Sequence, residues 1–211
     1  FGVGLVKTSE DFGAQGEVPS HPGILNYLAA SFVETGWDIK ALVKQIVMSK
    51  TYRQTSTAST EKFQSDPENR DLSRGSRFRM DSEMIRDQIL ASSGLLSSKM
   101  YGRSVKTPQP SGLWKAVGMG HFKPDKGEAV YRRSLYSYWR RSIPPPQMTI
   151  LNAPTRESCA ARRERTNTPL QALLLLNETE YLKAARNLAQ ITLSKTSLKK
   201  EEKLKYVFET I

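Results

Sequence analysis

The sequence predicts a mainly α-helical protein: a single compact helical domain of about six to eight helices, with long ordered loops and little or no β structure. Three observations carry this prediction. Apolar residues recur at the spacing of one helix face in several segments, and Gly, Pro or capping residues stand at their ends. No segment shows a β-hairpin signal or an unambiguous apolar and polar alternation, and no internal repeat is present. The 38% hydrophobic and 25% charged residues are typical of a globular domain.

The 211 residues suffice for one domain with a sizeable core, so we expect one helical domain over residues 1–211 that needs neither a disulfide nor a metal. The chain begins at Phe1 rather than Met and ends inside an amphipathic helical pattern, which indicates a fragment of a longer protein. No stretch approaches the roughly 18 uninterrupted apolar residues of a membrane span, so none is expected.

The first 50 residues predict a loop followed by a helical hairpin. Residues 1–20 are rich in Gly and have little periodicity, which is typical of a loop arm. Residues 22–50 carry two amphipathic stripes, and Ser20 or His21 is placed to cap the first helix. Gly36 is placed to end that helix and Asp38 to cap the next, so the short connection predicts two antiparallel helices.

The middle of the chain alternates between loops and one clear helix. Residues 51–65 are polar, rich in Ser and Thr and without periodicity, so we expect a surface loop. A helix follows, with Asp81 as its N-cap and Gly94 at its end. Residues 97–128 contain clusters of Pro and Gly and predict a long irregular loop, a kind of segment that is usually functional or disordered.

Residues 131–143 fit two structures. Leu135, Tyr138 and Trp139 share one helix face, whereas alternation over the same residues also fits a strand, and we favour the helix. The three prolines at 144–146 end either structure.

Residues 168–211 predict C-terminal helices that continue past the end of the chain. Thr168 and Gln171 have the spacing of a capping box, with proline at the first helical position between them. Asn177 and Glu180 repeat the capping signal for a second helix, and a last helix begins near residue 198.

The 32 Lys and Arg residues against 21 Asp and Glu residues give a net charge of +11, which favours an anionic partner. More than half of this charge lies in residues 129–165, which contain eight arginines, two acidic residues and no lysine. An arginine fork binds carboxylate, sulfate or phosphate with two parallel hydrogen bonds. The candidate anion- or glycan-binding residues are Arg132, Arg133, Arg156, Arg162, Arg163 and Arg165, together with Trp139 and Trp114. Alternatively, these arginines pair with acidic residues such as Asp81, Glu83 and Asp87 and with helix-end carbonyl groups.

The two tryptophans fit either sugar stacking or core packing. Trp139 lies among the arginines, where a ring beside cations suits a sugar or a base, but an aromatic residue at helical spacing more often fills a core. Trp114, in the proline-rich loop, is the better candidate for an exposed platform.

Few residues could support catalysis or bind a metal. Glu83 and Asp87 lie four positions apart on one helix face, as a carboxylate pair for acid–base chemistry requires, although nearby arginines could simply balance their charge. His21 is a candidate base, or a residue that bonds locally at a helix start. Cys159 is expected to be a buried structural thiol. One cysteine and two separated histidines predict no metal site, and no haem attachment motif is present.

Three blocks of sequence together resemble one known family. They are Gly-Leu-Val-x-Thr at Gly4 to Thr8 with the following Asp-Phe-Gly; Asp-Pro-Glu-Asn-Arg at Asp66 to Arg70 with Glu-Met-Ile-Arg-Asp at Glu83 to Asp87; and Tyr-Arg-Arg-Ser-Leu-Tyr at Tyr131 to Tyr136 through Arg-Thr-Asn-Thr-Pro-Leu-Gln at Arg165 to Gln171. Over nearly its whole length the chain resembles the planctomycete-type C-terminal "PSD" domain, domain of unknown function fifteen-fifty-three. One departure is visible: Asn152 stands where the family usually has Asp before Ala-Pro, which puts a catalytic or metal-binding carboxylate there in doubt.

The resemblance implies a large exported multidomain protein, with a cytochrome c-like domain that carries haem c upstream and gene surroundings that indicate breakdown of complex polysaccharides. We expect no cofactor in this chain, a periplasmic or otherwise extracytoplasmic location, and contact with the upstream domains and with acidic or sulfated polysaccharide. A scaffold or an anion- and glycan-contacting module is the first hypothesis, and a glycan-active enzyme domain that uses carboxylates is the second. A nucleic-acid binder is the third and lowest-ranked hypothesis. It is ranked last because the sequence contains no recognisable motif for reading nucleic acid.

Overall fold

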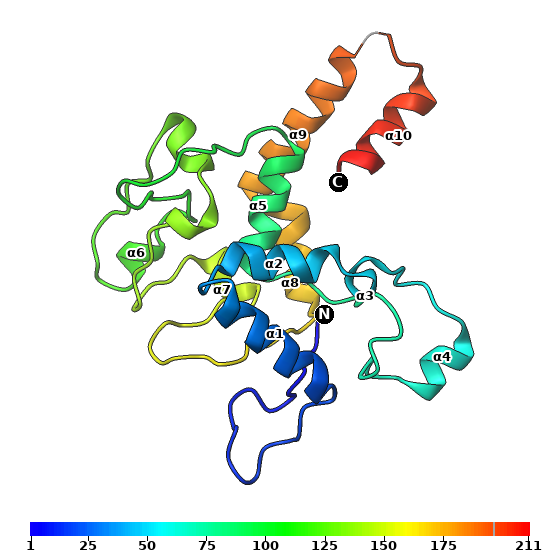
Figure 1. Ribbon diagram of the computed structural model, residues 1–211. Helices are drawn as coiled ribbons and strands as arrows, with labels where there is room; N and C mark the ends of the chain where they lie inside the picture. The colour runs from blue at the N-terminus through cyan, green and yellow to red at the C-terminus, as the bar shows by residue number, and fades with distance from the viewer. Residues whose placement is uncertain (196) are drawn as a thin grey trace. The chain divides into compact units, whose positions relative to one another are not determined.

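The computed structural model describes residues 1–195 and 197–211, and over these residues the mainly α class is confirmed, with 46% of the chain helical (Figure 1). Ten α-helices and two 3₁₀ turns are present within the described residues, with three isolated β-bridges and no sheet. The helices beyond the number expected from sequence are short. They are α3 (Lys50–Arg53), α4 (Thr60–Ser65), α6 (Leu113–Ala116) and α7 (Pro146–Ile150), each too short to show an apolar period.

The chain divides into two compact units, Phe1–Arg79 and Met80–Ile211. All the fully buried large apolar side chains among the described residues belong to the second unit. A single domain over residues 1–211 therefore stays a prediction.

The first unit begins with an irregular arm over residues 1–20 and continues with the predicted hairpin of α1 (Pro22–Glu34) and α2 (Ile39–Met48). Asp38 caps α2, because its Oδ1 accepts the backbone N–H of Ala41 at 3.0 Å. Gly36, with φ of 71°, makes the left-handed turn that ends α1. The expected cap of α1 is wrong: His21 is the N-cap residue, but its side chain caps nothing and instead meets the Ser20 hydroxyl at 3.0 Å.

The expectation of one continuous loop over residues 51–65 is also wrong. Two short helices, α3 and α4 (Thr60–Ser65), occupy part of this segment. Ser49 and Ser59 stand at their N-caps, and each hydroxyl oxygen accepts a backbone N–H from the first turn. Serine hydroxyls thus stabilise helical turns too short for an amphipathic pattern to reveal.

The second unit is organised around α5 (Ser82–Ser92), which packs against α9 (Thr179–Ser194). Figure 1 shows this pair at the centre of the second unit, with α7 and α8 (Pro169–Asn177) near one end. The core contains Leu90, Met148, Leu151, Tyr181 and Ala184. The final helix, α10 (Lys200–Thr210), contacts α9.

Arg86 of α5 is completely buried and ties this unit together. Its Nε and Nη2 donate to the two carboxylate oxygens of Glu180 at 2.9 and 2.6 Å. Its remaining hydrogen bonds reach the carbonyl oxygens of Val130 at 2.7 Å and Arg132 at 2.9 Å, and the Ser134 hydroxyl at 3.2 Å. The buried charge is thus fully hydrogen-bonded by a carboxylate, two backbone carbonyl groups and a hydroxyl.

The same contacts explain why the favoured helix over residues 131–143 is wrong. The segment instead forms two 3₁₀ turns, Gly127–Tyr131 and Ser134–Tyr136, and then an extended stretch in which Ser137 is bridged to Val105. A helix would use the carbonyl of Val130 to accept the N–H of Ser134. That carbonyl accepts Arg86 instead, and the Ser134 N–H donates to Asp87 Oδ1 at 2.7 Å.

The helices of the second unit confirm one predicted cap and correct two others. The capping box at the start of α8 is present, with Thr168 Oγ1 accepting the N–H of Gln171 and Gln171 Oε1 accepting the N–H of Thr168. The cap expected at Asn177 is wrong, since α9 starts after Glu178 and Glu180 binds Arg86. Asp81 precedes α5 but makes no cap bond, because its carboxylate faces Arg163 at 3.6 Å.

Candidate anion-binding surface

The eight arginines of residues 129–165 fall into two groups in the structure. Four contact carboxylates or carbonyl groups of their own unit: Arg132, Arg133, Arg163 and Arg165. The other four are exposed and have no carboxylate within ion-pair distance among the described residues: Arg140, Arg141, Arg156 and Arg162. Among the described residues, the charge of the second group is neutralised by no carboxylate, so it is the group most open to an external anion.

Arg132 serves the fold rather than the surface. Its side chain is 5% exposed, and its guanidinium lies 3.8 Å from the centroid of the Tyr136 ring. It donates to the carbonyl oxygens of Lys99 and Arg103 at 3.1 to 3.3 Å and to that of Tyr101. These contacts hold residues 99–103 against the 3₁₀ turns.

Arg163 forms a two-pronged ion pair with α5. Its Nη1 lies 2.6 Å from Glu83 Oε2 and its Nη2 lies 3.3 Å from Glu83 Oε1. Burial would raise the pKa of Glu83, but hydrogen bonds from Arg163, from its own backbone N–H and from Ser82 outweigh this effect and lower it below its ordinary value. The nearby Asp81 lies 3.9 Å from Arg165. Glu83 is therefore an ionised partner of an arginine.

Two arginines of the exposed group lie over tryptophan rings. The guanidinium of Arg156 is 4.3 Å from the centroid of Trp139, and that of Arg140 is 5.4 Å from the centroid of Trp114. Arg156 adopts φ of 65°, a left-handed conformation that costs energy in a residue with a Cβ. We call Trp139, Arg140, Arg141 and Arg156 the tryptophan–arginine surface. Arg162 lies six positions beyond Arg156 in the same irregular loop.

The two tryptophans differ from expectation. Trp114 is not an exposed platform: it is 8% exposed, it stacks on Phe122 with centroids 5.0 Å apart, and its Nε1 donates to Gln109 at 2.8 Å. The prediction fails because the long loop folds into α6 and covers its own indole. Trp139 is half-buried, and its Nε1 is enclosed without a hydrogen-bond partner among the described residues.

A family model described as "Protein of unknown function (DUF1553)", PSD1, matches residues 1–211. The chain belongs to the PSD1 family. The resemblance inferred from the three sequence blocks is thus confirmed. No curated protein and no solved structure matches the chain significantly. Over the described part of this PSD1 chain, every helix is too short or too polar to span a bilayer.

The candidate acid–base residues are not brought together as a catalytic group. Glu83 is bound by Arg163, and Asp87 accepts the N–H of Ser134 and lies 3.9 Å from both Arg86 and Arg133. His21 belongs to the first unit of the PSD1 chain, beside Ser20. No group of three His, Cys, Asp or Glu side chains placed for a metal occurs among residues 1–195 and 197–211.

Cys159 and Asn152 lie close to the tryptophan–arginine surface in sequence. Cys159 is exposed, so its expected burial is wrong; the loop that carries it has no regular structure to enclose a thiol. Asn152 Oδ1 accepts hydrogen bonds from Gln171 Nε2 at 2.7 Å and Thr166 Oγ1 at 2.8 Å. Its φ of 64° is one that Asn tolerates better than most residues, so Asn152 anchors the end of the arginine-rich loop.

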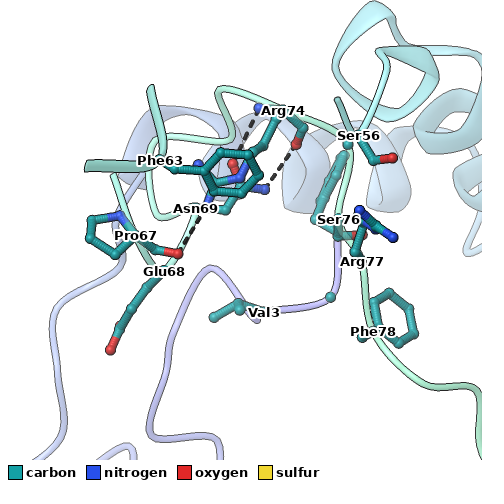
Figure 2. Close-up of a pocket in the computed structure, with 13 residues that line it drawn as sticks. Val3, Ser56, Phe63, Pro67, Glu68, Asn69, Arg74, Ser76, Arg77 and Phe78 are labelled. Carbon is teal, nitrogen blue, oxygen red and sulfur yellow. Dashed lines mark hydrogen bonds between the residues drawn. The ribbon is translucent and has the colours of Figure 1, made fainter. Parts of the chain in front are cut away.

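Sequence reasoning missed two features of the PSD1 chain. The Arg86–Glu180 pair leaves a weak signal: Arg86 shares a helix stripe with the buried Ser82 and Leu90. The second is a cavity of about 240 Å³ in the first unit, between Phe63 and Phe78 (Figure 2). No periodic pattern reveals this cavity, because its walls come from loops.

Proposed function

We propose that this PSD1 domain is a non-catalytic binding module that contacts acidic or sulfated polysaccharide through the tryptophan–arginine surface. One observation carries the proposal: four exposed arginines lack a carboxylate partner among the described residues, and one of them covers the ring of Trp139. Other arginines of the same segment are bound within the unit: Arg163 by Glu83, Arg165 by Asp81, and Arg132 by backbone carbonyl groups. The exposed ones are therefore free for an external anion.

The chemistry of this surface suits a charged sugar. A sulfate or uronate group accepts two parallel hydrogen bonds from an arginine fork. A sugar ring can lie on the face of Trp139 once Arg156 moves from the ring to the anionic group, and cation–π attraction keeps that guanidinium close meanwhile. Arg140 and Arg141 directly follow Trp139 in the chain, so a second anionic group of the same polymer would meet them.

The proposal includes the cellular setting that the family resemblance implies. The domain would belong to an exported, extracytoplasmic protein with an upstream cytochrome c-like domain, and its surface would hold that protein on the polysaccharide. A catalytic role for Glu83 and Asp87 has less support, because Arg163 and the Ser134 N–H already occupy these carboxylates. A role in nucleic-acid binding rests on charge and aromatic residues alone, without a recognisable motif for reading nucleic acid.

Binding of dextran sulfate tests the proposal, with unsulfated dextran as the neutral comparison. We expect retardation of the protein by dextran sulfate in affinity electrophoresis at low salt, weakening as salt rises. The variant R140Q/R141Q/R156Q should bind about tenfold or more weakly, because about 1.4 kcal/mol, one charge-assisted contact, corresponds to a factor of ten.

The matched control is K40Q/K44Q/K50Q, which removes the same charge from exposed positions of α2 and α3. It should retain most of the binding. Equal losses in the two variants would mean that net charge alone attracts the polymer, and the proposal would fail. Equally tight retention by duplex DNA at physiological salt would favour the nucleic-acid hypothesis instead.

A further inference from the structure

The first unit contains a cavity of about 240 Å³, and none of its lining residues takes part in the proposed function. Figure 2 shows Phe63 and Pro67 on one side of it, Ser76, Arg77 and Phe78 on the other, and Val3 below. Phe63 and Phe78 are 41% and 48% exposed, so both residues leave apolar surface in contact with solvent. Exposed aromatic side chains that line a cavity provide apolar surface that a ligand can bury.

The wall that carries Phe63 is fixed before any ligand arrives. Asp66 is buried, and its carboxylate accepts the N–H groups of Arg70 at 2.7 Å and Asp71 at 3.0 Å. Arg74 is also buried; it donates to the carbonyl oxygens of Asp66 and Pro67 at 2.7 and 2.8 Å. Its guanidinium lies 4.4 Å from the centroid of Phe63 and so holds one face of that ring.

The opposite wall is anchored at its start, at Gly75. The N–H of Gly75 donates to the carbonyl of Thr55 at 2.8 Å. A Cβ at Gly75 would lie 2.6 Å from the carbonyl oxygen of Gln54, so only glycine allows this approach. The rim from Ser76 to Phe78 is therefore anchored where it begins.

The charges around the cavity favour an anion. Arg77 is exposed and has no ion-pair partner among the described residues, whereas the buried charges of Arg74 and Asp66 offset each other. The one carboxylate of the lining, Glu68, is held by Lys7 at 2.9 Å. The hydrogen bond from Lys7 lowers the pKa of Glu68 below its ordinary value, so this carboxylate stays ionised and paired.

We propose that this cavity binds a carboxylate-bearing six-membered ring, with the ring between Phe63 and Phe78 and the carboxylate on Arg77. The cavity lies below the range of about 300 to 1,000 Å³ of drug-sized ligands, so one ring fills it. Both a uronic acid and an aromatic acid have this chemistry. The site is independent of the proposed function, because it shares no residue with the tryptophan–arginine surface and lies in the other unit.

Ligand titration followed by ¹H–¹⁵N NMR on the full chain tests the proposal, with glucuronate and benzoate as probes and glucose and benzyl alcohol as their neutral counterparts. At least one acid should produce saturable shifts at Ser56, Ser76 and Phe78, and its neutral counterpart should bind about fivefold to tenfold more weakly. Which acid binds identifies the ring as a sugar or an aromatic one.

Variants make the result specific. R77Q should reduce the affinity for the acid to that of its neutral counterpart, whereas R53Q, at an exposed arginine of α3 outside the cavity, should leave it unchanged. F78L, with retained fold, should weaken both acid and neutral probes. The triple variant R140Q/R141Q/R156Q should bind the acid normally, which separates this site from the proposed function. The absence of saturable shifts with both acids, or equal effects of R77Q and R53Q, would overturn the proposal.

Discussion

The guanidinium of Arg86 has five hydrogen bonds inside the second unit, and two of them form a bidentate pair with Glu180. An ion pair in this position differs in kind from the surface pair of Arg133 and Asp87, which are 3.9 Å apart with the arginine side chain 48% exposed. Removing one member of a buried pair leaves a charge in a medium that solvates it poorly. At the surface, water replaces the lost partner.

This contrast gives a prediction for two arginine variants. R86M should destabilise the second unit by about 3 to 5 kcal/mol, because Glu180 and two backbone carbonyls lose their partner. R133M should cost less than about 1 kcal/mol. Urea unfolding followed by circular dichroism measures both. A cost of R86M as small as that of R133M would show that the buried pair contributes little.

A second prediction concerns Glu83 and pH. The pKa of Glu83 is lower in the folded chain than in the unfolded one, chiefly through Arg163 working against burial, so the unfolded state binds protons more readily. The stability that Glu83 adds is therefore present above its unfolded pKa of about 4.3 and is lost as pH falls through the lower folded value.

The test compares the wild type with E83Q across pH. The wild type should be the more stable at neutral pH, by less than about 1 kcal/mol because Arg163 is partly exposed to solvent. The difference should shrink below about pH 4.5 and disappear in stronger acid. E61Q in the exposed first turn of α4 is the control, and its difference should stay small at every pH. A difference for E83Q that grows toward acid would contradict the assignment.

At the scale of elements, the start of α8 joins three segments through one side chain. Gln171 is buried, and its Oε1 completes the capping box with the N–H of Thr168. Its Nε2 donates to the carbonyl of Ile150 at 2.8 Å, to Asn152 Oδ1 at 2.7 Å and to Thr166 Oγ1 at 3.0 Å. The amide oxygen of Gln171 thus caps the helix, and its amide nitrogen anchors the arginine-rich loop.

Two substitutions separate these roles. T168A removes one half of the capping box and should cost about 1 kcal/mol. Q171E keeps an acceptor for the Thr168 N–H but has no N–H₂ group for Ile150 and Asn152, so it should cost more, about 2 kcal/mol or above. Thermal unfolding gives both values, and NMR shifts of residues 152–166 should change in Q171E only. Equal costs and unchanged loop shifts would mean that the amide acts only as a cap.

At the scale of the whole molecule, the sequence predicts best where a single stretch of chain decides the structure. The hairpin of α1 and α2 and the capping box of α8 depend on residues a few positions apart, and they are confirmed. Residues 131–143 follow a partner 44 to 48 positions away, Arg86, which takes the groups that a helix would use. No local pattern contains that information.

The candidate site shows the same limit. The composition of residues 129–165 identifies an arginine-rich segment, but only the fold distinguishes Arg132 and Arg163, which are bound internally, from Arg140 and Arg156, which are exposed. The net charge of +11 thus overestimates the positive charge that is accessible to an external anion. Half of the arginines in the most basic segment contact groups of their own unit.

The pairing of Arg86 with Glu180 also has a consequence for the order of folding. The two residues are 94 positions apart, so the contact closes a long loop and forms late compared with the helices themselves. During synthesis α5 is complete well before α9 exists, and until α9 is made the guanidinium of Arg86 lacks the Glu180 carboxylate that neutralises its charge. Burial of the Arg86 charge, on which the native turns of residues 130–134 depend, therefore waits for α9, a late-made helix of the unit.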